Sequence, residues 1–254
     1  MCKLAYYRTK EKDAYNVCVN MIKHQENVVA GHSTSLTWKD NNGFNIRKAI
    51  GKINSFLAKY PDKPSTYECM GHTRYATIGE INLDNQHPIP IIVHGKTIGY
   101  GIHNGTFTRH NDYEYLRTDI KNKTDSALLF IMFGKLLERI GDSTKNRCIA
   151  LSYISELTND QNFIVMFRND LVLFAGSVLT YKVTEDSIGV MTFGYKNKCD
   201  SKTIYLIQGN NLHQYPKVDS PFKFKPKPPI RQSFKKKTHN WGGWDYDYSW
   251  GGFR

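Results

Sequence analysis

The sequence lacks any long hydrophobic run. Its 254 residues are 40% hydrophobic, and the mean hydropathy is −0.53. No apolar stretch approaches the ~18–20 residues that a membrane-spanning helix needs. The opening residues, MCKLAYYRTKEKD, carry charges early and contain no apolar segment of the kind found in signal peptides. A membrane protein is therefore excluded, and a cytoplasmic location is expected.

The chain also has few cysteines, and their pattern is unlike that of a metal or disulfide site. The five cysteines are odd in number and widely spaced, with no C-x-x-C pair. This spacing argues against a disulfide framework and against a zinc site, and favours reduced thiols. No phosphate-binding loop, G-x-G-x-x-G string or H-E-x-x-H string is present. No metal and no cofactor are therefore expected.

Positive charge is abundant but unevenly placed. The formal net charge is +12, and the stretch KFKPKPPIRQSFKKKTH near the C-terminus carries seven Lys or Arg without an acid. The aromatic, glycine-rich stretch NWGGWDYDYSWGGFR follows it. Proline and low complexity exclude a regular helix or central strand here, so we expect a domain at 1–219 and a disordered tail at 220–254. The tail has three open interpretations: a solvated appendage, a docking peptide for a partner, or a weak nucleic-acid contact.

The body of the chain alternates strand and helix patterns. Helical periodicity is found at residues 13–24, 46–60, 110–118, 126–140 and 146–157. Strand patterns lie at residues 27–36, 68–76, 89–94 and 97–103, and six more short ones follow residue 160. Strand clusters on both sides of helices predict an α+β fold in which helices cover the sheets in layers.

Cys2 is the first candidate for chemistry. Removal of the initiator methionine would leave this residue with both a thiol and a free α-amino group. An α-amine has an ordinary pKa of about 7.7–8.0, so it can take the thiol proton near neutral pH. Nucleophile and base would then belong to one residue. A cysteine at position 2 also occurs by chance, so this residue alone decides nothing.

Three further stretches place polar side chains beside turn-forming residues: GHTRYATIGE at 71–80, IHNG at 102–105 and TDS at 124–126. Each has a simple structural explanation. Arg74 could be a surface cation, Asn104-Gly105 a tight turn, and Asp125 a helix cap. The stretch at 71–80 shows neither the helical nor the strand spacing of apolar residues. It is therefore either an ordered polar loop or the wall of a pocket for a charged ligand.

In this order the stretches resemble the class II glutamine amidotransferases. These are N-terminal-nucleophile hydrolases and include the glutaminase half of glucosamine-6-phosphate synthase. The resemblance covers about residues 2–215 with spacings kept. The matching strings are Met1-Cys2-Lys3-Leu4, GHTRYATIG at 71–79, Asn85-Gln86-His87-Pro88, Ile102-His103-Asn104-Gly105 with Leu116-Arg117, and Thr124-Asp125-Ser126. It implies a four-layer αββα sandwich, with two antiparallel sheets between layers of helices.

The resemblance implies a catalytic role for three residues. The Cys2 thiolate would attack the side-chain carboxamide of L-glutamine, with its own α-amine as the base. The side chain of Asn104 and the backbone N–H of Gly105 would form the oxyanion hole for the tetrahedral intermediate. Ammonia would leave first, and water would then hydrolyse the glutamyl thioester to glutamate.

Substrate binding is implied for four other residues. Arg74 would bind the α-carboxylate of glutamine as a fork, and Asp125 would bind its α-ammonium group. Tyr75 and Thr77 would line the same wall. On this interpretation the string at 71–80 is a pocket wall, with Arg74 as its charged anchor.

The chain departs from the family pattern at three positions. Lys3 replaces the glycine beside the nucleophile, where its charge could lower the thiol pKa or its bulk could fill space kept free for the backbone. Tyr75 replaces a tryptophan and Ile78 a histidine. An active glutaminase and a non-catalytic binding protein that contacts nucleic acid through its tail are therefore both kept as hypotheses.

The acceptor of the nitrogen is not readable from these residues. Full-length family members join this domain to a synthetase, a transferase or a sugar isomerase, whereas only the tail follows residue 215 here. We therefore expect a stand-alone glutaminase subunit that supplies ammonia to a separate synthetase or transferase. A protein that acts on γ-glutamyl amides other than glutamine is a further hypothesis. Richness in Lys, Asn and Tyr fits an AT-rich genome, such as a viral one.

Overall fold

The computed structural model describes residues 2–27, 31–77, 79–117, 122 and 124–227. Its helices are α1 (Ala14–Glu26), α2 (Ile53–Lys59), the 3-10 helix η1 (His110–Leu116), α3 (Asp125–Ile140) and α4 (Thr144–Leu157). Its strands are β1 (Lys3–Thr9), β2 (Ser33–Asp40), β3 (Gly43–Ile50), β4 (Glu68–Arg74), β5 (Ile89–Val93), β6 (Lys96–Asn104), β7 (Asn162–Phe167), β8 (Leu171–Ala175), β9 (Leu179–Val183), β10 (Ser187–Thr192), β11 (Asn197–Lys198), β12 (Thr203–Gln208) and β13 (Asn211–Pro216).

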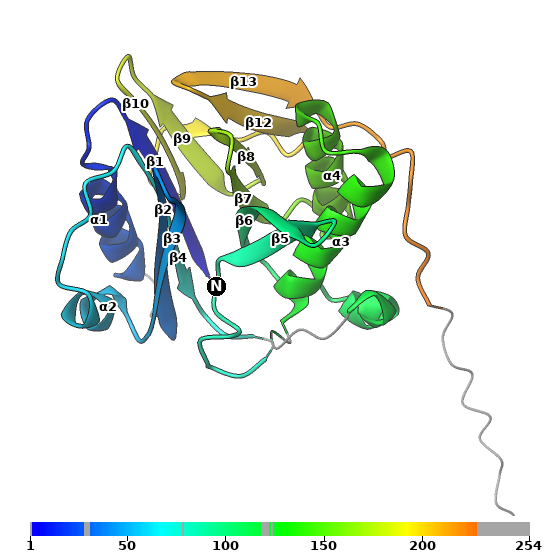
Figure 1. The fold of residues 1–254 in the computed structure, drawn as a ribbon, viewed down its shortest axis with the longest axis horizontal. Coiled ribbons are helices and arrows are strands. Elements are labelled where there is room, and N and C mark those ends of the chain that lie inside the picture. The colour runs from blue at the N-terminus through cyan, green and yellow to red at the C-terminus, as the bar shows by residue number, and fades with distance from the viewer. Residues whose placement is uncertain (1, 28–30, 78, 118–121, 123, 228–254) are drawn as a thin grey trace, which may run out of the picture.

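These elements form four layers, as Figure 1 shows. Helices α1 and α2 cover a seven-stranded sheet of order β11-β9-β10-β1-β4-β2-β3. A six-stranded sheet of order β13-β12-β8-β7-β6-β5 faces it, and α3 and α4 cover the outer side. Neighbouring strands pair antiparallel in both sheets. The expected αββα sandwich is therefore confirmed.

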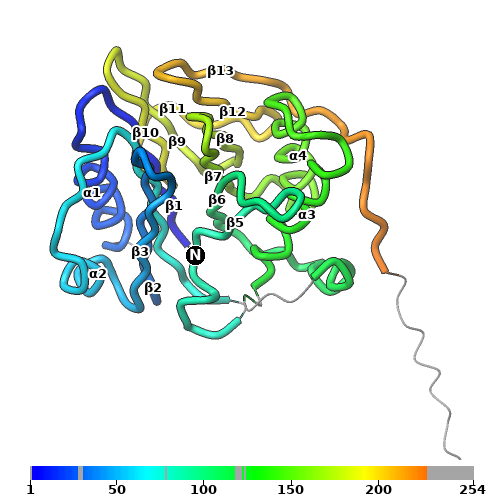
Figure 2. The backbone as a smooth tube through the Cα atoms, in the orientation of Figure 1, coloured from blue at the N-terminus to red at the C-terminus, as the bar shows by residue number. Residues whose placement is uncertain are grey.

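The first strand of the chain lies inside the first sheet. Strand β1 pairs with β10 on one edge and with β4 on the other, although β10 is about 180 residues away in sequence. Figure 2 shows β1 and β10 in the same part of the molecule. The register pairs Ala5 with Met191 on one side and with Gly71 on the other. Because β1 is held on both edges, the residue directly before it, Cys2, has a fixed position where the two sheets face each other.

Side-chain alternation along the strands divides the core. In β1, Leu4 and Tyr6 pack between the two sheets, whereas Ala5 packs with α1. In β7, Ile164 faces the other sheet and Phe163 faces the helices. Successive strand residues point to opposite faces, so each sheet needs apolar residues on both sides. This is why the strands read as short, almost continuous apolar runs.

The sequence-based expectation for residues 46–60 is wrong in its first half. The structure has strand β3 there and begins a helix, α2, only at Ile53. Ile46 and Ala49 have helical spacing, but the tight connection after Asp40 returns the chain to pair with β2 along its whole length. Gly51 then adopts a positive φ of 96°, which ends the strand before the helix. Tertiary pairing overrides local periodicity in this segment.

The other expected helices and strands are present with shifts of a few residues. Thr124 caps α3, accepting a hydrogen bond from the Ala127 N–H at 3.2 Å. The segment expected to be helical after residue 110 is the 3-10 helix η1. The two-residue strand β11 has no sequence signal of its own. Part of the strand expected at 27–36 lies outside the described residues.

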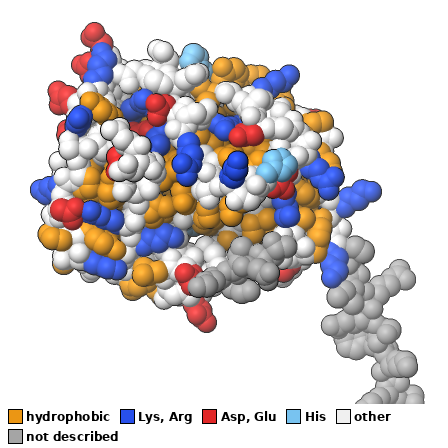
Figure 3. Space-filling model, in the orientation of Figure 1, with side chains coloured by type: hydrophobic (Ala, Val, Ile, Leu, Met, Phe, Trp, Pro, Cys, Tyr) orange, Lys and Arg blue, Asp and Glu red, His pale blue; other side chains and the backbone are white. Residues whose placement is uncertain are grey.

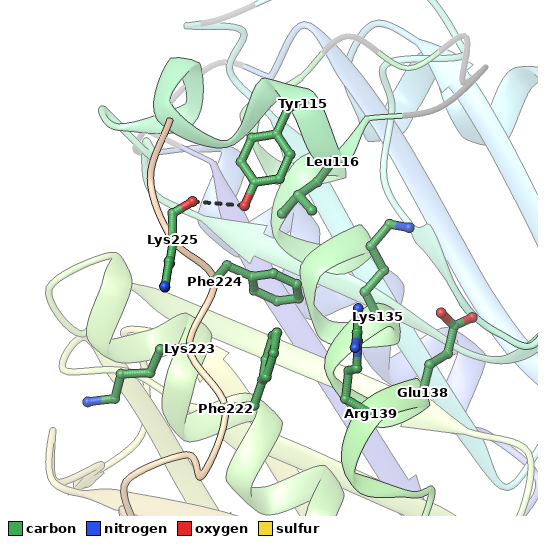
Figure 4. Close-up of a pocket in the computed structure, with 9 residues that line it drawn as sticks. All are labelled: Tyr115, Leu116, Lys135, Glu138, Arg139, Phe222, Lys223, Phe224 and Lys225. Atoms are coloured by element: carbon green, nitrogen blue, oxygen red, sulfur yellow. Dashed lines mark hydrogen bonds between the residues drawn. The ribbon is translucent and has the colours of Figure 1, made fainter. Parts of the chain in front are cut away.

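The chain continues to pack after residue 219, which differs from the expected start of a disordered tail. Figure 4 shows Phe222 and Phe224 beside η1 and α3, and both rings contact the core beneath the helices. The Tyr115 hydroxyl donates to the Lys225 carbonyl at 2.8 Å, and Phe224 N–H donates to the Tyr153 hydroxyl at 3.0 Å. Two aromatic side chains and these hydrogen bonds hold the segment from Phe222 to Lys225 against the helices. Residues 228–254 lie outside the described part.

On the face drawn in Figure 3, the Lys and Arg side chains do not gather into a basic patch. They lie scattered among acidic and neutral side chains. Most of the basic stretch on which the nucleic-acid hypothesis depends lies outside the described residues, so that hypothesis stays a prediction. Among the described helices, none is long and apolar enough to cross a bilayer.

Candidate active site

The seven residues expected at the site come together at one end of the space between the sheets. Cys2 precedes β1, Arg74 ends β4, Tyr75 and Thr77 follow it, Asn104 ends β6, and Asp125 opens α3. Gly105 directly follows Asn104. They line two adjoining hollows that share Cys2, Tyr75, Thr77 and Gly105. Ile78, one of the departures from the family pattern, lies outside the described residues.

The two hollows differ in size and lining. The inner pocket is narrow, about 10 Å³, and its further walls are Arg74, His87, His103, Thr124, Asp125 and Ser126. The outer cavity is about 420 Å³, and its further walls are Lys3, Asn104, Thr106, Thr108, Gln161, Asn162, Val178 and Phe193. Cys2 lies at the junction, so its sulfur can be reached from both sides.

The position of the Cys2 sulfur is set by the backbone. Pairing of β1 with β4 places Lys3 opposite Thr73, and the Tyr75 N–H donates a hydrogen bond to the Cys2 Sγ at 3.3 Å. Burial raises the pKa of the Cys2 thiol, and this backbone contact offsets only part of the rise. The thiol is therefore protonated at neutral pH, and a reaction at this sulfur needs a base.

Arg74 and Asp125 bring opposite charges to the inner pocket. Arg74 is 3% exposed, and its guanidinium donates to the carbonyls of Glu80 and Gly79 at 3.0 and 3.4 Å. Asp125 is 4% exposed, and its Oδ2 accepts from the Phe107 N–H at 2.6 Å. Burial lowers the pKa of Arg74, an effect that the negative charge of Asp125 opposes. The pocket thus offers one cation and one anion to a ligand that carries both charges.

Asn104 and Gly105 form the wall on the other side of Cys2. Asn104 pairs with Asn162 across β6 and β7, and its carbonyl accepts from the Asn162 side chain at 3.3 Å. Its own side chain is left to line the outer cavity. A Cβ at Gly105 would lie 2.1 Å from the Gln161 Oε1, so a larger residue there would displace the Gln161 side chain. An amide side chain and a backbone N–H therefore lie next to each other beside the sulfur.

A hydrogen-bonded network supports this wall, and the sequence analysis missed it. Gln161 donates through Nε2 to the Thr106 carbonyl at 2.8 Å, and its Oε1 lies 2.9 Å from the His103 Nε2. The His103 Nδ1 lies 2.9 Å from the Ser126 hydroxyl. Burial lowers the pKa of His103, which keeps the ring neutral. In one neutral tautomer the His103 Nε2–H donates to Gln161 and the Nδ1 accepts from the Ser126 hydroxyl. Both ring nitrogens of His103 then have a hydrogen-bond partner.

His32 supports the opposite wall and was also missed. Its Nδ1 accepts from the Ala76 N–H at 3.0 Å, and its ring stacks on Tyr75 at 4.6 Å between centroids. This histidine holds the loop that carries Tyr75 and Thr77. Neither it nor Gln161 belongs to a recognisable motif, and each reaches the site only through strand pairing. No sequence signal could have identified them.

Two buried histidines lie behind the inner pocket. The ring centroids of His72 and His87 lie 4.1 Å apart, the rings are tilted by 38°, and both residues are almost fully buried. Burial lowers the pKa of His72 from 6.5 to about 3 and that of His87 well below its ordinary value. The positive charges of Arg74 and Lys48 act in the same direction. Both rings are therefore neutral in the folded protein at physiological pH.

These histidines predict a loss of stability in mild acid. The unfolded chain takes up protons near pH 6.5, whereas the folded chain resists protonation until near pH 3 at His72. The stabilisation is therefore complete above pH 6.5 and is lost as the pH falls. We expect each such histidine to lower the free energy of unfolding by about 1.4 kcal/mol per pH unit below 6.5.

Urea unfolding between pH 7 and pH 4.5 measures this slope. His72→Phe keeps a ring of similar shape and should reduce the slope by about 1.4 kcal/mol per pH unit. His24→Phe, at an exposed position of α1, is the matched control. An equal slope in wild type and His72→Phe would show that His72 does not titrate in this way.

The described residues contain no group of three His, Cys, Asp or Glu placed to hold a metal ion. The residues that line the two hollows include a thiol, an amide side chain and a pair of opposite charges.

Comparison with known proteins gives several partial sequence matches and a set of structural ones. No protein-family model matches the chain. Over 126 residues, or 48% of its length, it is 29% identical to a glutamine–fructose-6-phosphate aminotransferase (isomerizing) from Oceanobacillus iheyensis. This match covers 20% of that protein, so the chain spans only about a fifth of the curated relative.

Two solved structures superpose on most of the chain. A glutamine phosphoribosylpyrophosphate amidotransferase from B. subtilis matches with a TM-score of 0.67 and 15% identity, over 85% of this chain and 49% of that one. A glutamine aminotransferase class-II domain protein from Silicibacter pomeroyi matches with a TM-score of 0.55 and 12% identity. This second match covers 85% of this chain and 100% of that one. At such identities the similarity shows a shared fold.

Proposed function

We propose that this chain, which has the fold of the class II glutamine amidotransferases, hydrolyses the side-chain amide of L-glutamine through a thioester on Cys2. The observation that carries the proposal is the position of the Cys2 sulfur between two complementary walls. On one side are the buried charges of Arg74 and Asp125, and on the other are the donors of Asn104 and Gly105.

Glutamine fits this arrangement in one orientation. Its α-carboxylate lies against Arg74 and its α-ammonium against Asp125, inside the inner pocket. The side-chain carbonyl then reaches Cys2, with its oxygen toward the Asn104 amide and the Gly105 N–H. Because the inner pocket is narrow, its lining side chains have to shift to admit the α-carbon end.

The base is the α-amino group that Cys2 acquires when Met1 is removed. Burial keeps the thiol protonated, so the sulfur needs a proton acceptor on the same residue or next to it. The α-amine takes the thiol proton, the sulfur attacks the amide carbon, and the proton passes to the departing nitrogen as ammonia. Water then cleaves the thioester and releases glutamate. Each tetrahedral intermediate places its oxyanion on the Asn104 and Gly105 donors, because these are fixed before the reaction begins.

Ammonia is the second product, and we propose that a separate synthetase or transferase consumes it. Two observations support this part: the curated relative joins the matched region to a much longer chain, and the Silicibacter chain is matched over its whole length. Affinity capture with the purified full chain, followed by assay of glutamine-dependent amination by the captured protein, tests it. Capture of no enzyme that uses ammonia would contradict it.

Hydrolysis is tested with the full chain expressed without an N-terminal tag. Mass spectrometry records which fraction begins at Cys2, and glutamate release from L-glutamine is measured on the same sample. We expect release in proportion to the fraction that begins at Cys2, and a loss of at least about 10³-fold in Cys2→Ala.

The matched control is Cys148→Ala, which removes a half-buried thiol from α4, away from the site. It should keep the wild-type rate. Absence of glutamate from a sample that begins at Cys2 would refute the proposal. Full activity of a chain that keeps Met1 would refute the assigned base.

A further inference from the structure

The outer cavity is much larger than ammonia, the product proposed to leave from this side of Cys2, requires. Ammonia is about the size of a water molecule, whose share of liquid volume is ~30 Å³, whereas the cavity holds about 420 Å³. It adjoins Asn104 and Gly105 and lies across Cys2 from Arg74 and Asp125. The nitrogen of the bound amide therefore points into this space, and so would any group attached to that nitrogen.

Lys3 brings a positive charge into the outer cavity. Lys3 as a whole residue is 5% exposed, its side chain lines the cavity, and its Nζ lies 5.1 Å from the centre of the Phe193 ring. Its ammonium has no hydrogen bond and no ion pair with any described residue, and the cavity lining includes no Asp or Glu. An ammonium that faces a cavity without an anionic partner can pair with an anion that a ligand supplies.

The rest of the lining suits an organic ligand with one anionic group. Val178 and Phe193 give an apolar wall, and the hydroxyls of Thr106 and Thr108 give polar contacts beside it. Phe193 has a φ of 57°, a region that bulky residues rarely adopt. Its N–H donates to the Val178 carbonyl at 3.3 Å, which ties the two apolar residues together. The Phe193 ring is 50% exposed, so it lies at the rim of the cavity beside the ammonium.

We propose that Lys3 makes the outer cavity a carboxylate-binding subsite, so that the chain hydrolyses γ-glutamyl amides whose leaving amine carries a carboxylate, such as γ-glutamyl amino acids. The inference rests on the proposed function, because it uses the same thiol and the same inner pocket. It adds a substrate class and names Lys3 as the residue that selects it.

A carboxylate fits this subsite better than a phosphate. The lining has a single cation and no arginine. Phosphate sites typically combine guanidinium forks or a helix N-terminus with several backbone N–H groups. The single ammonium of Lys3 balances the one negative charge of a carboxylate, and the two threonine hydroxyls can donate hydrogen bonds to its oxygens.

The reaction keeps the steps proposed for glutamine. The sulfur of Cys2 forms a bond to the γ-carbonyl carbon, the C–N bond breaks, and the proton from the thiol passes through the α-amine to the leaving nitrogen. The departing amino acid leaves through the outer cavity, and water cleaves the thioester. In sum, the γ-glutamyl amino acid and one water give glutamate and the free amino acid.

Binding to the full chain carrying Cys2→Ala tests the subsite without turnover. The two probes are γ-L-glutamyl-L-alanine and γ-L-glutamyl-L-alaninamide, which have the same shape and differ in the carboxylate. We expect calorimetry to show at least about tenfold tighter binding of the acid. Adding Lys3→Met should bring the ratio of dissociation constants to about one, whereas adding Lys3→Arg should keep the preference for the acid.

Lys12→Met is the matched control in the same background. Lys12 is exposed and also lies over an aromatic ring, Tyr67 at 5.3 Å, but outside the cavity. Its substitution should keep the preference. Equal binding of the two probes with Lys3 present would overturn the inference, as would a preference that survives Lys3→Met.

Turnover separates this inference from the proposed function. Wild-type protein that begins at Cys2 is given L-glutamine and each probe, and glutamate is measured. Glutamine hydrolysis without preference for the acid would refute the substrate class alone. A carboxylate preference in binding without glutamate from any substrate would refute hydrolysis at Cys2, and with it the substrate class, and would leave the subsite as a binding site.

Discussion

Asn104→Ala is expected to lower kcat for glutamate release by about 10²–10³-fold, because it removes one of two donors to the oxyanion. The Asn104 side chain lines the outer cavity, whereas the strand pairing and the bond to Asn162 use its backbone. The loss should therefore fall on the reaction and leave the fold intact. Steady-state glutamate release and thermal unfolding, measured on the same preparations, separate the two effects.

Two further variants sharpen this test. Asn104→Asp keeps the size of the side chain but loses the amide donor, so it should be impaired at least as strongly. Asn41→Ala, in the exposed turn between β2 and β3, is the surface control and should behave as wild type. A kcat for Asn104→Ala within threefold of wild type would remove Asn104 from the oxyanion hole.

Asp125→Asn is expected to raise KM for glutamine by about 10–100-fold with a smaller change in kcat, since a hydrogen bond to a charged group contributes roughly 1.5–3 kcal/mol. Asparagine has the same shape, and its oxygen can still accept from the Phe107 N–H. The substitution therefore removes the negative charge and keeps the contact between the start of α3 and the loop that follows β6. Initial rates over a range of glutamine concentrations give the two parameters.

Asp112→Asn is the control for this substitution. Asp112 pairs with Arg109 on the surface of η1 at 3.0 Å, so its change alters the net charge equally but lies outside the pocket. Its KM should equal that of wild type. An unchanged KM in Asp125→Asn would show that the α-ammonium group is bound elsewhere.

Much of the fold follows from local sequence patterns. Strands with apolar residues on both faces, such as β7, and the Thr124 cap of α3 are legible because the physical signal lies within one segment. Residues 46–60 show the limit of this reasoning. Whether β3 forms depends on pairing with β2, and the helical spacing of Ile46 and Ala49 carries no information about that partner.

The site divides in a similar way. The strings around Arg74, Asn104 and Asp125 point to a shared pocket, and the structure does place these residues around Cys2. Their chemical roles are predictions that the variants above test. Residues that hold the walls, such as His32 and Gln161, come from segments that meet only after the sheets form. No reading of one segment at a time could assign them.

The hydrogen bond from the Tyr75 N–H to the Cys2 sulfur bears on when the newly made protein becomes active. Strand pairing and this bond fix the sulfur through β1 and β4, independently of the α-amine. Under the proposed mechanism, a newly synthesised chain can fold with its site assembled and still be inert. Removal of Met1 would then be the step that makes the folded site active, whenever it takes place.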